Sequence, residues 1–228
     1  MRTALVVFDM AGTTVSDKGN VNKAFRDALA EENIMVGMEE VNTLMGYRKI
    51  EAITRMVVKQ LTSLTTAEQT ALIEKIHDRF NRIMVDFYQS DADLQPLPFA
   101  EELFRTLQDR GIKVALNTGF TRVITDAILQ RLGWNQTPMI DTVICSDEVP
   151  EGRPYPYMIQ SVMQKLGITD TQQVVKVGDT EVDVNEGRNA GCGFVAAVTT
   201  GAYTREQLLE YRPDVIIDSL QELPAFIL

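Results

Sequence analysis

Residues 4–14 read ALVVFDMAGTT, a short apolar run that ends in Asp9 and passes directly into a Gly-Thr turn. An apolar run without polar alternation is typical of a strand buried on both faces of a parallel sheet. Similar runs recur along the chain, at 113–116, 142–145, 174–177 and 194–198. The stretches between them have helical patterns, at 121–132, 157–166 and 182–190. This alternation predicts an α/β fold with a doubly wound, Rossmann-like parallel sheet.

One long segment interrupts the alternation between the first and second expected strands. From about residue 21 to 88 we find helical periodicity and no convincing strand. The second half of this segment carries an apolar stripe at helical spacing, made of Leu72, Ile73, Ile76, Phe80, Ile83, Met84 and Phe87. We therefore expect an α-helical cap at 19–91, inserted into a core domain built from 1–18 and 92–228. The stripe either closes the core of the cap or contributes to a homodimer through the cap, and the sequence leaves both open.

Charge and composition restrict the partners of the chain. It has 228 residues and a formal net charge of −10. Nucleic-acid and anionic membrane surfaces bind clusters of Lys and Arg, so the negative balance argues against both. No apolar run approaches the about 20 residues that span a bilayer, and the run after Arg2 is too short for a signal peptide. We expect a small anionic molecule as the partner.

The cysteines indicate a reducing compartment. Cys145 and Cys192 are the two cysteines of the chain, and their spacing fits neither a metal site nor a disulfide framework. Two buried thiols are the simpler interpretation. Together with the missing signal peptide, this predicts a cytoplasmic protein.

Acidic residues follow two of the expected strands. Asp9 ends the first strand, and residues 174–183 (VVKVGDTEVD) place Asp179 after another strand and Asp183 four positions later. Ligands of open α/β sheets bind beyond the carboxyl ends of the strands, so the three carboxylates converge if the two strands are neighbours. Mg²⁺ prefers such oxygen donors and completes its shell with water and phosphate. Asp179 alone would fit a helix N-cap equally well, but that role does not explain the whole array.

Two further segments suit a phosphoryl group. The strand at 113–116 runs into Asn117, Thr118 and Gly119, where a hydroxyl and backbone N–H groups can hold phosphoryl oxygens. Arg153 lies in a loop rich in Gly and Pro after the next strand, and its guanidinium can pair with phosphate in a bidentate manner. Each segment alone would pass for a turn or a surface charge; their order along the chain gives them weight.

Together these motifs resemble the haloacid dehalogenase superfamily, over essentially the whole chain. The resemblance implies that Asp9 is a nucleophile that forms an aspartyl-phosphate. It also implies a Mg²⁺ site made of Asp9, the Ala11 backbone carbonyl and Asp179, with Asp183 either ligating or supporting the ion. The residues it implies for substrate and phosphate binding are Ala11, Gly12, Thr13, Met45, Thr118, Gly119 and Arg153.

Ala11 points to one branch of this superfamily. Most of its phosphatases carry a second Asp two positions after the nucleophile, which protonates the leaving alkoxide. General acid help is typically worth about 10²–10⁴-fold, so an ester phosphatase would not discard it lightly. A carbon leaving group that departs as an enamine needs no such acid. The Ala at this position therefore favours cleavage of a P–C bond.

The phosphonoacetaldehyde hydrolase (phosphonatase) branch has this feature, and the chain is similar to it around Met45–Lys49, 118–122 and 149–156. The similarity implies that Lys49 forms a Schiff base with the substrate aldehyde, after burial or a nearby cation lowers its pKa. Where that branch has a His three residues later, this chain has Ala52. The only histidine, His77, is not expected to be catalytic.

The function prediction is a Mg²⁺-dependent hydrolase of phosphonoacetaldehyde or a related phosphonate. A phosphatase of esters or anhydrides, similar to phosphoglycolate phosphatases, is the main alternative. A non-catalytic binding protein on the same fold is a third.

Overall fold

The protein is described here by a computed structural model that covers residues 2–62, 64–92 and 94–228. Six strands form one parallel sheet in the order β3-β2-β1-β4-β5-β6. Their bounds are β1 Leu5–Asp9, β2 Lys113–Thr118, β3 Thr142–Cys145, β4 Val174–Gly178, β5 Phe194–Val198 and β6 Val215–Ile217. The order reverses at β1, which lies between β2 and β4, and this is the position where open α/β sheets bind ligands.

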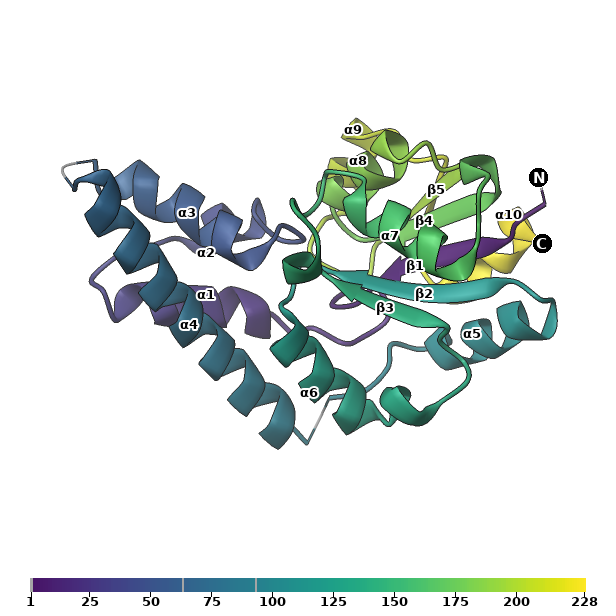
Figure 1. Cartoon of the computed structure of the whole chain (residues 1–228), viewed down its shortest axis with the longest axis horizontal. Coiled ribbons are helices and arrows are strands. Elements are labelled where there is room, and N and C mark those ends of the chain that lie inside the picture. Colours follow the sequence, from purple (N-terminus) through teal and green to yellow (C-terminus); the bar gives the residue numbers. More distant parts are fainter. Residues whose placement is uncertain (1, 63, 93) are drawn as a thin grey trace.

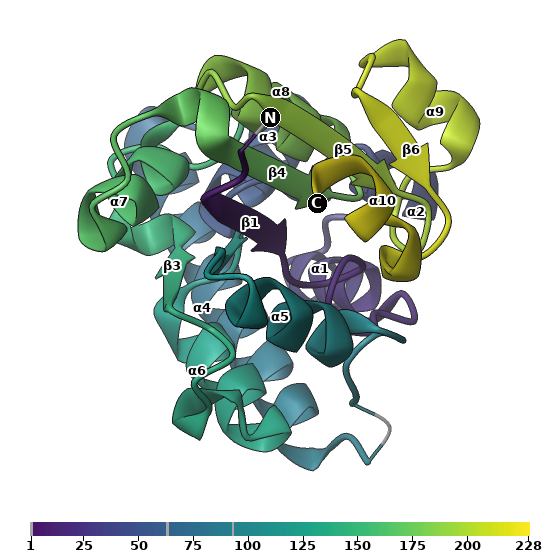
Figure 2. The same ribbon diagram turned by 90° about the vertical axis from the view of Figure 1, so that its right-hand side faces the viewer.

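Helices cover both faces of the sheet, and alternate strand residues point to them. Val6 and Phe8 of β1 pack into one apolar cluster with α5, whereas Leu5 and Val7 pack into a second cluster with α7 and α8. Figure 2 shows α5 on one side of the strands and α7 and α8 on the other. The bounds of the helices outside the segment between β1 and α5 are α5 Ala100–Asp109, α6 Arg122–Leu132, α7 Tyr157–Leu166, α8 Glu181–Asn189, α9 Arg205–Glu210 and α10 Pro224–Ile227. Burial on both faces explains the continuous apolar character of these strands.

Four helices follow β1 before the chain enters α5 and β2. They are α1 Asn20–Ala30, α2 Met38–Asn42, α3 Lys49–Gln60 and α4 Thr66–Ser90, and we call residues 20–90 the helical insert. The insert lies beyond the carboxyl ends of the central strands, beside the sheet in Figure 1. Its helices pack on one another, with Phe25 of α1 stacked on Phe80 of α4 at 4.4 Å between ring centroids. The insert therefore covers the edge of the sheet at which Asp9 lies.

The apolar stripe expected in the second half of the insert closes the core of the insert. In α4, Ile73, Ile76, Phe80 and Met84 are buried and belong to the same cluster as α1 and α3. A capping box starts this helix, because the Thr65 hydroxyl accepts the Glu68 N–H while the Glu68 carboxylate accepts the Thr65 N–H. A homodimer through the cap, and the exact limits of the cap as a domain, stay predictions.

The sheet confirms the predicted fold class. The five expected strands are present within one or two residues of the predicted bounds, and the insert contains no strand among its described residues. The sequence did not single out β6 or α5. β6 spans only Val215–Ile217, which is too short to show a period, and it pairs with β5 at the edge of the sheet.

Phe104 tests the apolar cluster between the sheet and α5. Its ring is fully buried and packs edge-on against Phe8 at 5.3 Å and Trp134 at 5.6 Å. We expect Phe104→Ala to lower the free energy of unfolding by about 3–5 kcal/mol, because the cavity cannot close against a rigid sheet. Urea unfolding measures the change. The matched control Phe226→Ala removes a ring that is 50% exposed and should cost less than about 1 kcal/mol; an equal loss in both variants would contradict this packing.

Candidate active site

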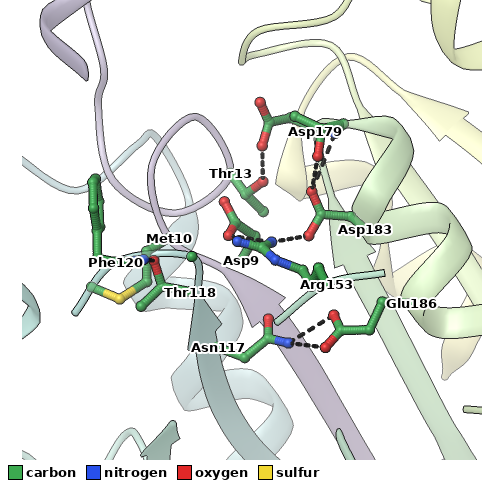
Figure 3. Close-up of polar contacts among 12 residues, drawn as sticks. Asp9, Met10, Thr13, Asn117, Thr118, Phe120, Arg153, Asp179, Asp183 and Glu186 are labelled. Carbon is green, nitrogen blue, oxygen red and sulfur yellow. Dashed lines mark hydrogen bonds and ion pairs between the residues drawn. The ribbon is translucent and has the colours of Figure 1, made fainter. Parts of the chain in front are cut away.

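Three carboxylates meet where β1 and β4 end. Asp9, Asp179 and Asp183 are all buried, and one oxygen of each lies within 4.8 Å of the others. Asp9 is the last residue of β1, Asp179 follows β4 directly, and Asp183 lies in the first turn of α8. Figure 3 shows the guanidinium of Arg153 between Asp9 and Asp183, and the Asp179 side chain above them, turned to Thr13. The strand order thus produces the convergence that the sequence predicts.

Asp179 is held from two sides by loops that follow strands. Its Oδ1 accepts the Thr13 hydroxyl at 2.9 Å, and its Oδ2 accepts the Ala202 backbone N–H at 2.7 Å. Both loops come so close that only glycine fits. A Cβ at Gly12 would lie 2.7 Å from Asp179 Oδ2, and one at Gly201 would lie 1.9 Å from the same atom. The sequence did not identify the loop of Gly201 and Ala202, because neither residue carries a functional side chain.

The electrostatics of this cluster fit a divalent cation. Burial raises the pKa of Asp179 well above its ordinary range, and the nearby charges of Asp9 and Asp183 raise it further. Burial also raises the pKa of Asp9, although Arg153 opposes the shift. Carboxylates crowded in this way need a cation to stay ionised together, and hard oxygen ligands suit Mg²⁺. The residues present could therefore hold Mg²⁺ through Asp9, Asp179 and the backbone carbonyl of Ala11, with Asp183 beside them.

Arg153 is buried between two of the carboxylates. Its Nη1 donates to Asp9 Oδ1 at 2.6 Å and also to Asp183 Oδ1. Burial alone would raise the pKa of Asp183, but attraction by Arg153 and Lys176 outweighs it and lowers the pKa to about 2. No residue in the described part of the chain accepts the Arg153 Nε–H, although this atom is buried. A buried donor beside Asp9 is suited to a phosphoryl oxygen of the substrate.

A second layer of buried charges lies beneath the carboxylates. The Lys176 ammonium of β4 is fully buried, donates to Asn117 Oδ1 at 2.6 Å and lies 3.0 Å from Asp183 and 3.3 Å from Glu186. The Asn117 amide donates to both oxygens of Glu186, at 2.9 and 2.8 Å. The sequence analysis did not single out Lys176 or Glu186. A lysine in the middle of an apolar strand was the available signal, since an unpaired ammonium is not tolerated there.

β2 brings the expected phosphoryl-binding segment next to Asp9. Asn117 lies opposite Asp9 in the register of the sheet, so Thr118 and Gly119 follow at the same edge. The Thr118 hydroxyl oxygen accepts the Phe120 N–H at 3.2 Å and is buried, and both Thr118 and Gly119 line the cavity in front of Asp9. Their contact with a phosphoryl group stays a prediction that this placement supports.

The Gly12 and Thr13 backbone amides are engaged within their own turn. Gly12 N–H donates to the Val15 carbonyl at 2.8 Å, and Thr13 N–H donates to the Met10 carbonyl at 3.2 Å. These N–H groups are therefore not free within the turn to hold a phosphoryl oxygen. Gly12 and Ala11 line the cavity, whereas the Thr13 side chain turns to Asp179. The structure thus gives Gly12 and Thr13 a role in shaping the turn, and their phosphate contact stays a prediction.

A loop of the helical insert lies on the edge of the sheet and leads into α3. Its Tyr47 hydroxyl donates to Glu181 at 2.8 Å, and Arg48 Nη1 donates to the Pro150 carbonyl at 3.0 Å. The loop packs directly against two glycines of the core, where a larger residue would clash. A Cβ at Gly119 would lie 2.4 Å from the Tyr47 carbonyl oxygen, and one at Gly152 would lie 2.7 Å from Arg48 Cβ. Met45 belongs to the same loop, is buried and lines the cavity.

Lys49 is the first residue of α3 and is 4% exposed. Its Nζ lies 4.9 Å from the centroid of the Phe120 ring and 5.5 Å from that of Phe25, and no described carboxylate is within ion-pair distance. Burial lowers the pKa of Lys49 from its ordinary 10.5 to about 8, with a further contribution from Arg153, although Asp9 and Asp17 oppose the shift. A fraction of the Lys49 side chains is therefore a neutral, nucleophilic amine near neutral pH.

One cavity of about 480 Å³ joins these groups. Its wall includes Asp9, Arg153 and Asp179 from the core and Lys49 from the insert. Ala52 is buried one turn beyond Lys49 and is not part of the wall, so no imidazole takes the place of the missing His there. His77 is half-buried in α4, outside the wall of the cavity. The cavity therefore brings the predicted nucleophile and the predicted imine-forming lysine to one space.

A buried acidic triad thus lies at the switch point of a parallel sheet, with Arg153 between two of its carboxylates and a helical insert above it. The model of the haloacid dehalogenase-like hydrolase family matches residues 6–197 of this chain. The chain therefore belongs to the haloacid dehalogenase-like hydrolases and is a hydrolase.

Individual relatives and solved structures are similar to this chain over most of its length. A phosphonoacetaldehyde hydrolase of Bacillus cereus is 32% identical over 212 residues, which cover 87% of this chain and 76% of the relative. A structure from Oleispira antarctica, described as a phosphonoacetaldehyde hydrolase-like protein, superimposes with a TM-score of 0.84 at 23% identity, over 100% of this chain and 92% of the other. The structure of a predicted phosphoglycolate phosphatase from Haemophilus somnus superimposes with a TM-score of 0.82 at 20% identity, over 100% of this chain and 99% of the other. The two structures share the fold with this chain.

Among the described residues, no helix is both long and apolar enough to cross a membrane. Both cysteines are free and buried, as expected from their spacing, and burial raises the pKa of each thiol to about 12.

The pKa of Lys49 predicts a pH-dependent cost of burying this side chain. Below about pH 8 the ammonium is charged in both the folded and the unfolded chain, so the full cost is present. Between about 8 and 10.5 only the folded chain releases the proton, and the cost disappears as the pH rises. We expect Lys49→Met to raise the free energy of unfolding at pH 7 by about 1–3 kcal/mol, and the gain to shrink toward pH 10.

Urea unfolding at several pH values, in the presence of EDTA, measures this gain. The matched control is Lys59→Met in the same helix, since the Lys59 side chain is 69% exposed and should change stability by less than about 0.5 kcal/mol. A loss of stability in Lys49→Met at pH 7 would show that the ammonium is well compensated where it lies.

Proposed function

We propose that this hydrolase cleaves the P–C bond of phosphonoacetaldehyde or a related phosphonate that carries a carbonyl group. The observation that carries the proposal is the buried, low-pKa amine of Lys49 in the same cavity as Asp9. The Bacillus cereus relative supports it, because that protein is a phosphonoacetaldehyde hydrolase and is 32% identical in sequence to this chain. Ala11 supports it too, because the cavity wall has methyl at the position where ester phosphatases of the superfamily have a general acid.

The reaction begins with the neutral Lys49 amine, which adds to the substrate carbonyl and gives an imine with loss of water. Protonation of the imine makes it an acceptor for an electron pair. The Asp9 carboxylate then attacks phosphorus, the P–C bond breaks, and its electron pair moves into the imine to form an enamine. The enamine takes a proton at carbon, and water releases the aldehyde from Lys49. A second water hydrolyses the aspartyl-phosphate and releases phosphate.

The remaining groups stabilise charge on phosphorus. Arg153 holds Asp9 and offers its free Nε–H to a phosphoryl oxygen, and the Thr118 hydroxyl lies at the same edge. Mg²⁺ bound by Asp9 and Asp179 would reduce the repulsion between the carboxylate and the anionic phosphonate. The insert covers these groups, which keeps bulk water away from the imine.

Phosphate release from phosphonoacetaldehyde tests the reaction. We expect the wild type to release phosphate with Mg²⁺ and to stop when EDTA is added. Asp9→Asn and Lys49→Arg should each lower kcat by at least about a thousandfold, because one lacks the nucleophile and the other cannot form an imine at neutral pH. Borohydride added with the substrate should inactivate the wild type and label Lys49, which peptide mass spectrometry detects. Turnover of phosphoglycolate without any release from phosphonoacetaldehyde would overturn the P–C assignment and leave the Asp9 chemistry standing.

Ala11→Asp tests the significance of the missing general acid. With an acid at this position, we expect hydrolysis of phosphate esters such as phosphoglycolate to rise by at least about tenfold, since general acid help is worth about 10²–10⁴-fold. Release of phosphate from phosphonoacetaldehyde should not rise. Ala11→Asn is the matched control, because it has the same size without a transferable proton. Equal ester hydrolysis in the two variants would show that the acid is not what limits this activity.

A further inference from the structure

The insert side of the cavity has polar residues that the proposed reaction does not use. Asn22 and Arg26 of α1 and Asn42 of α2 line this part of the wall. Asn22 is buried, and Arg26 and Asn42 are partly buried. The cavity of about 480 Å³ lies within the range of about 300–1,000 Å³ typical of pockets for ligands much larger than phosphonoacetaldehyde. These residues therefore face space that the smallest expected substrate leaves unfilled.

Hydrogen bonds within this group engage both of its side-chain amide oxygens. Asn22 donates through Nδ2 to Asn42 Oδ1 at 2.6 Å and to the Met38 carbonyl at 3.0 Å. The Asn22 Oδ1 accepts Arg26 Nε–H at 3.0 Å, one turn further along α1. Both side-chain amide oxygens are thus occupied by protein donors.

The donors of the group remain available. Within residues 2–62, 64–92 and 94–228, no acceptor is found for Asn42 Nδ2 or for the two terminal nitrogens of Arg26, and Arg26 has no carboxylate within ion-pair distance. The nearby charged side chains have other partners. Lys23 is exposed and pairs with Asp27, and Asp17 turns Oδ1 to the Asn20 N–H at 2.8 Å. A cluster of donors around an Arg fork in a cavity wall is complementary to an anion.

We propose that Arg26 and Asn42 form a subsite for a carboxylate at the end of the substrate remote from phosphorus. The planar fork of Arg26 suits the two oxygens of a carboxylate, and Asn42 Nδ2 supplies a further donor. This inference rests on the proposed function, because it takes phosphorus to lie at Asp9 and the carbonyl at Lys49. The substrate class is then a phosphonate with a carbonyl group and a terminal carboxylate, rather than phosphonoacetaldehyde itself.

Binding of two probes that cannot be cleaved tests the subsite apart from the reaction. Isothermal titration calorimetry of the full chain with Mg²⁺ compares 3-phosphonopropionate with propylphosphonate, which lacks the carboxylate and has the same phosphonate end. We expect 3-phosphonopropionate to bind at least about tenfold more tightly, and Arg26→Met to reduce this ratio below about threefold. Asn42→Asp keeps the acceptor for Asn22 but replaces the free donor by an anionic oxygen, so it should also reduce the ratio.

Lys23→Met is the matched control for general electrostatics. It removes a positive charge from the same wall at a side chain that is 67% exposed and paired, and it should keep the ratio of the wild type. Equal affinity of the two probes for the wild type, including no detectable binding of either, overturns the subsite. So does an equal loss in Lys23→Met and Arg26→Met. Neither probe has a carbonyl, so these results do not depend on whether P–C cleavage occurs.

Discussion

The compensation of buried charge at Arg153 is the constraint on which the site depends. Three carboxylates lie within reach of one another at the end of the sheet, and an ion removed from water is costly unless it is paired and hydrogen-bonded. Arg153 joins Asp9 of β1 to Asp183 of α8, and Lys176 joins Asp183 to the layer beneath. One guanidinium thereby fixes the orientation of the Asp9 carboxylate and still retains an Nε–H without an acceptor among the described residues.

Close packing at glycine residues fixes how the helical insert lies on the core, as the ion pairs of Arg153 fix the carboxylates. Gly119 leaves room for the backbone carbonyl of Tyr47, Gly152 leaves room for the Arg48 Cβ, and Gly46 in that loop leaves room for the Thr180 side chain. The hydrogen bond from the Tyr47 hydroxyl to Glu181 adds to these close contacts. Lys49 follows this loop directly, so these contacts fix the point at which its side chain enters the cavity that Asp9 also lines.

The sequence allowed prediction of the sheet, the insert and the acidic triad because each leaves a local pattern. Continuous apolar strands, helical periodicity and acidic residues after strands can all be found without knowing the packing. The contacts of Gly201, Ala202 and Glu186 could not be found in this way, because they depend on which loops meet across the sheet. The engaged amides of Gly12 and Thr13 belong to the same category. Their hydrogen bonds are decided by the local turn, which a Gly-Thr pair alone does not specify.

The burial of Lys49 beneath the helical insert links the conformation of the insert to the protonation of this amine. The pKa of about 8 exists because α3 and the rings of Phe25 and Phe120 exclude water from the amine. In water the same amine has its ordinary pKa of 10.5 and is almost fully charged at neutral pH. An opening of the insert that wets Lys49 would therefore let this amine take up a proton, and closure would release it again. Through Lys49, an equilibrium between such an open form and the closed one would depend on pH before any substrate has bound, with alkaline solution favouring the closed form.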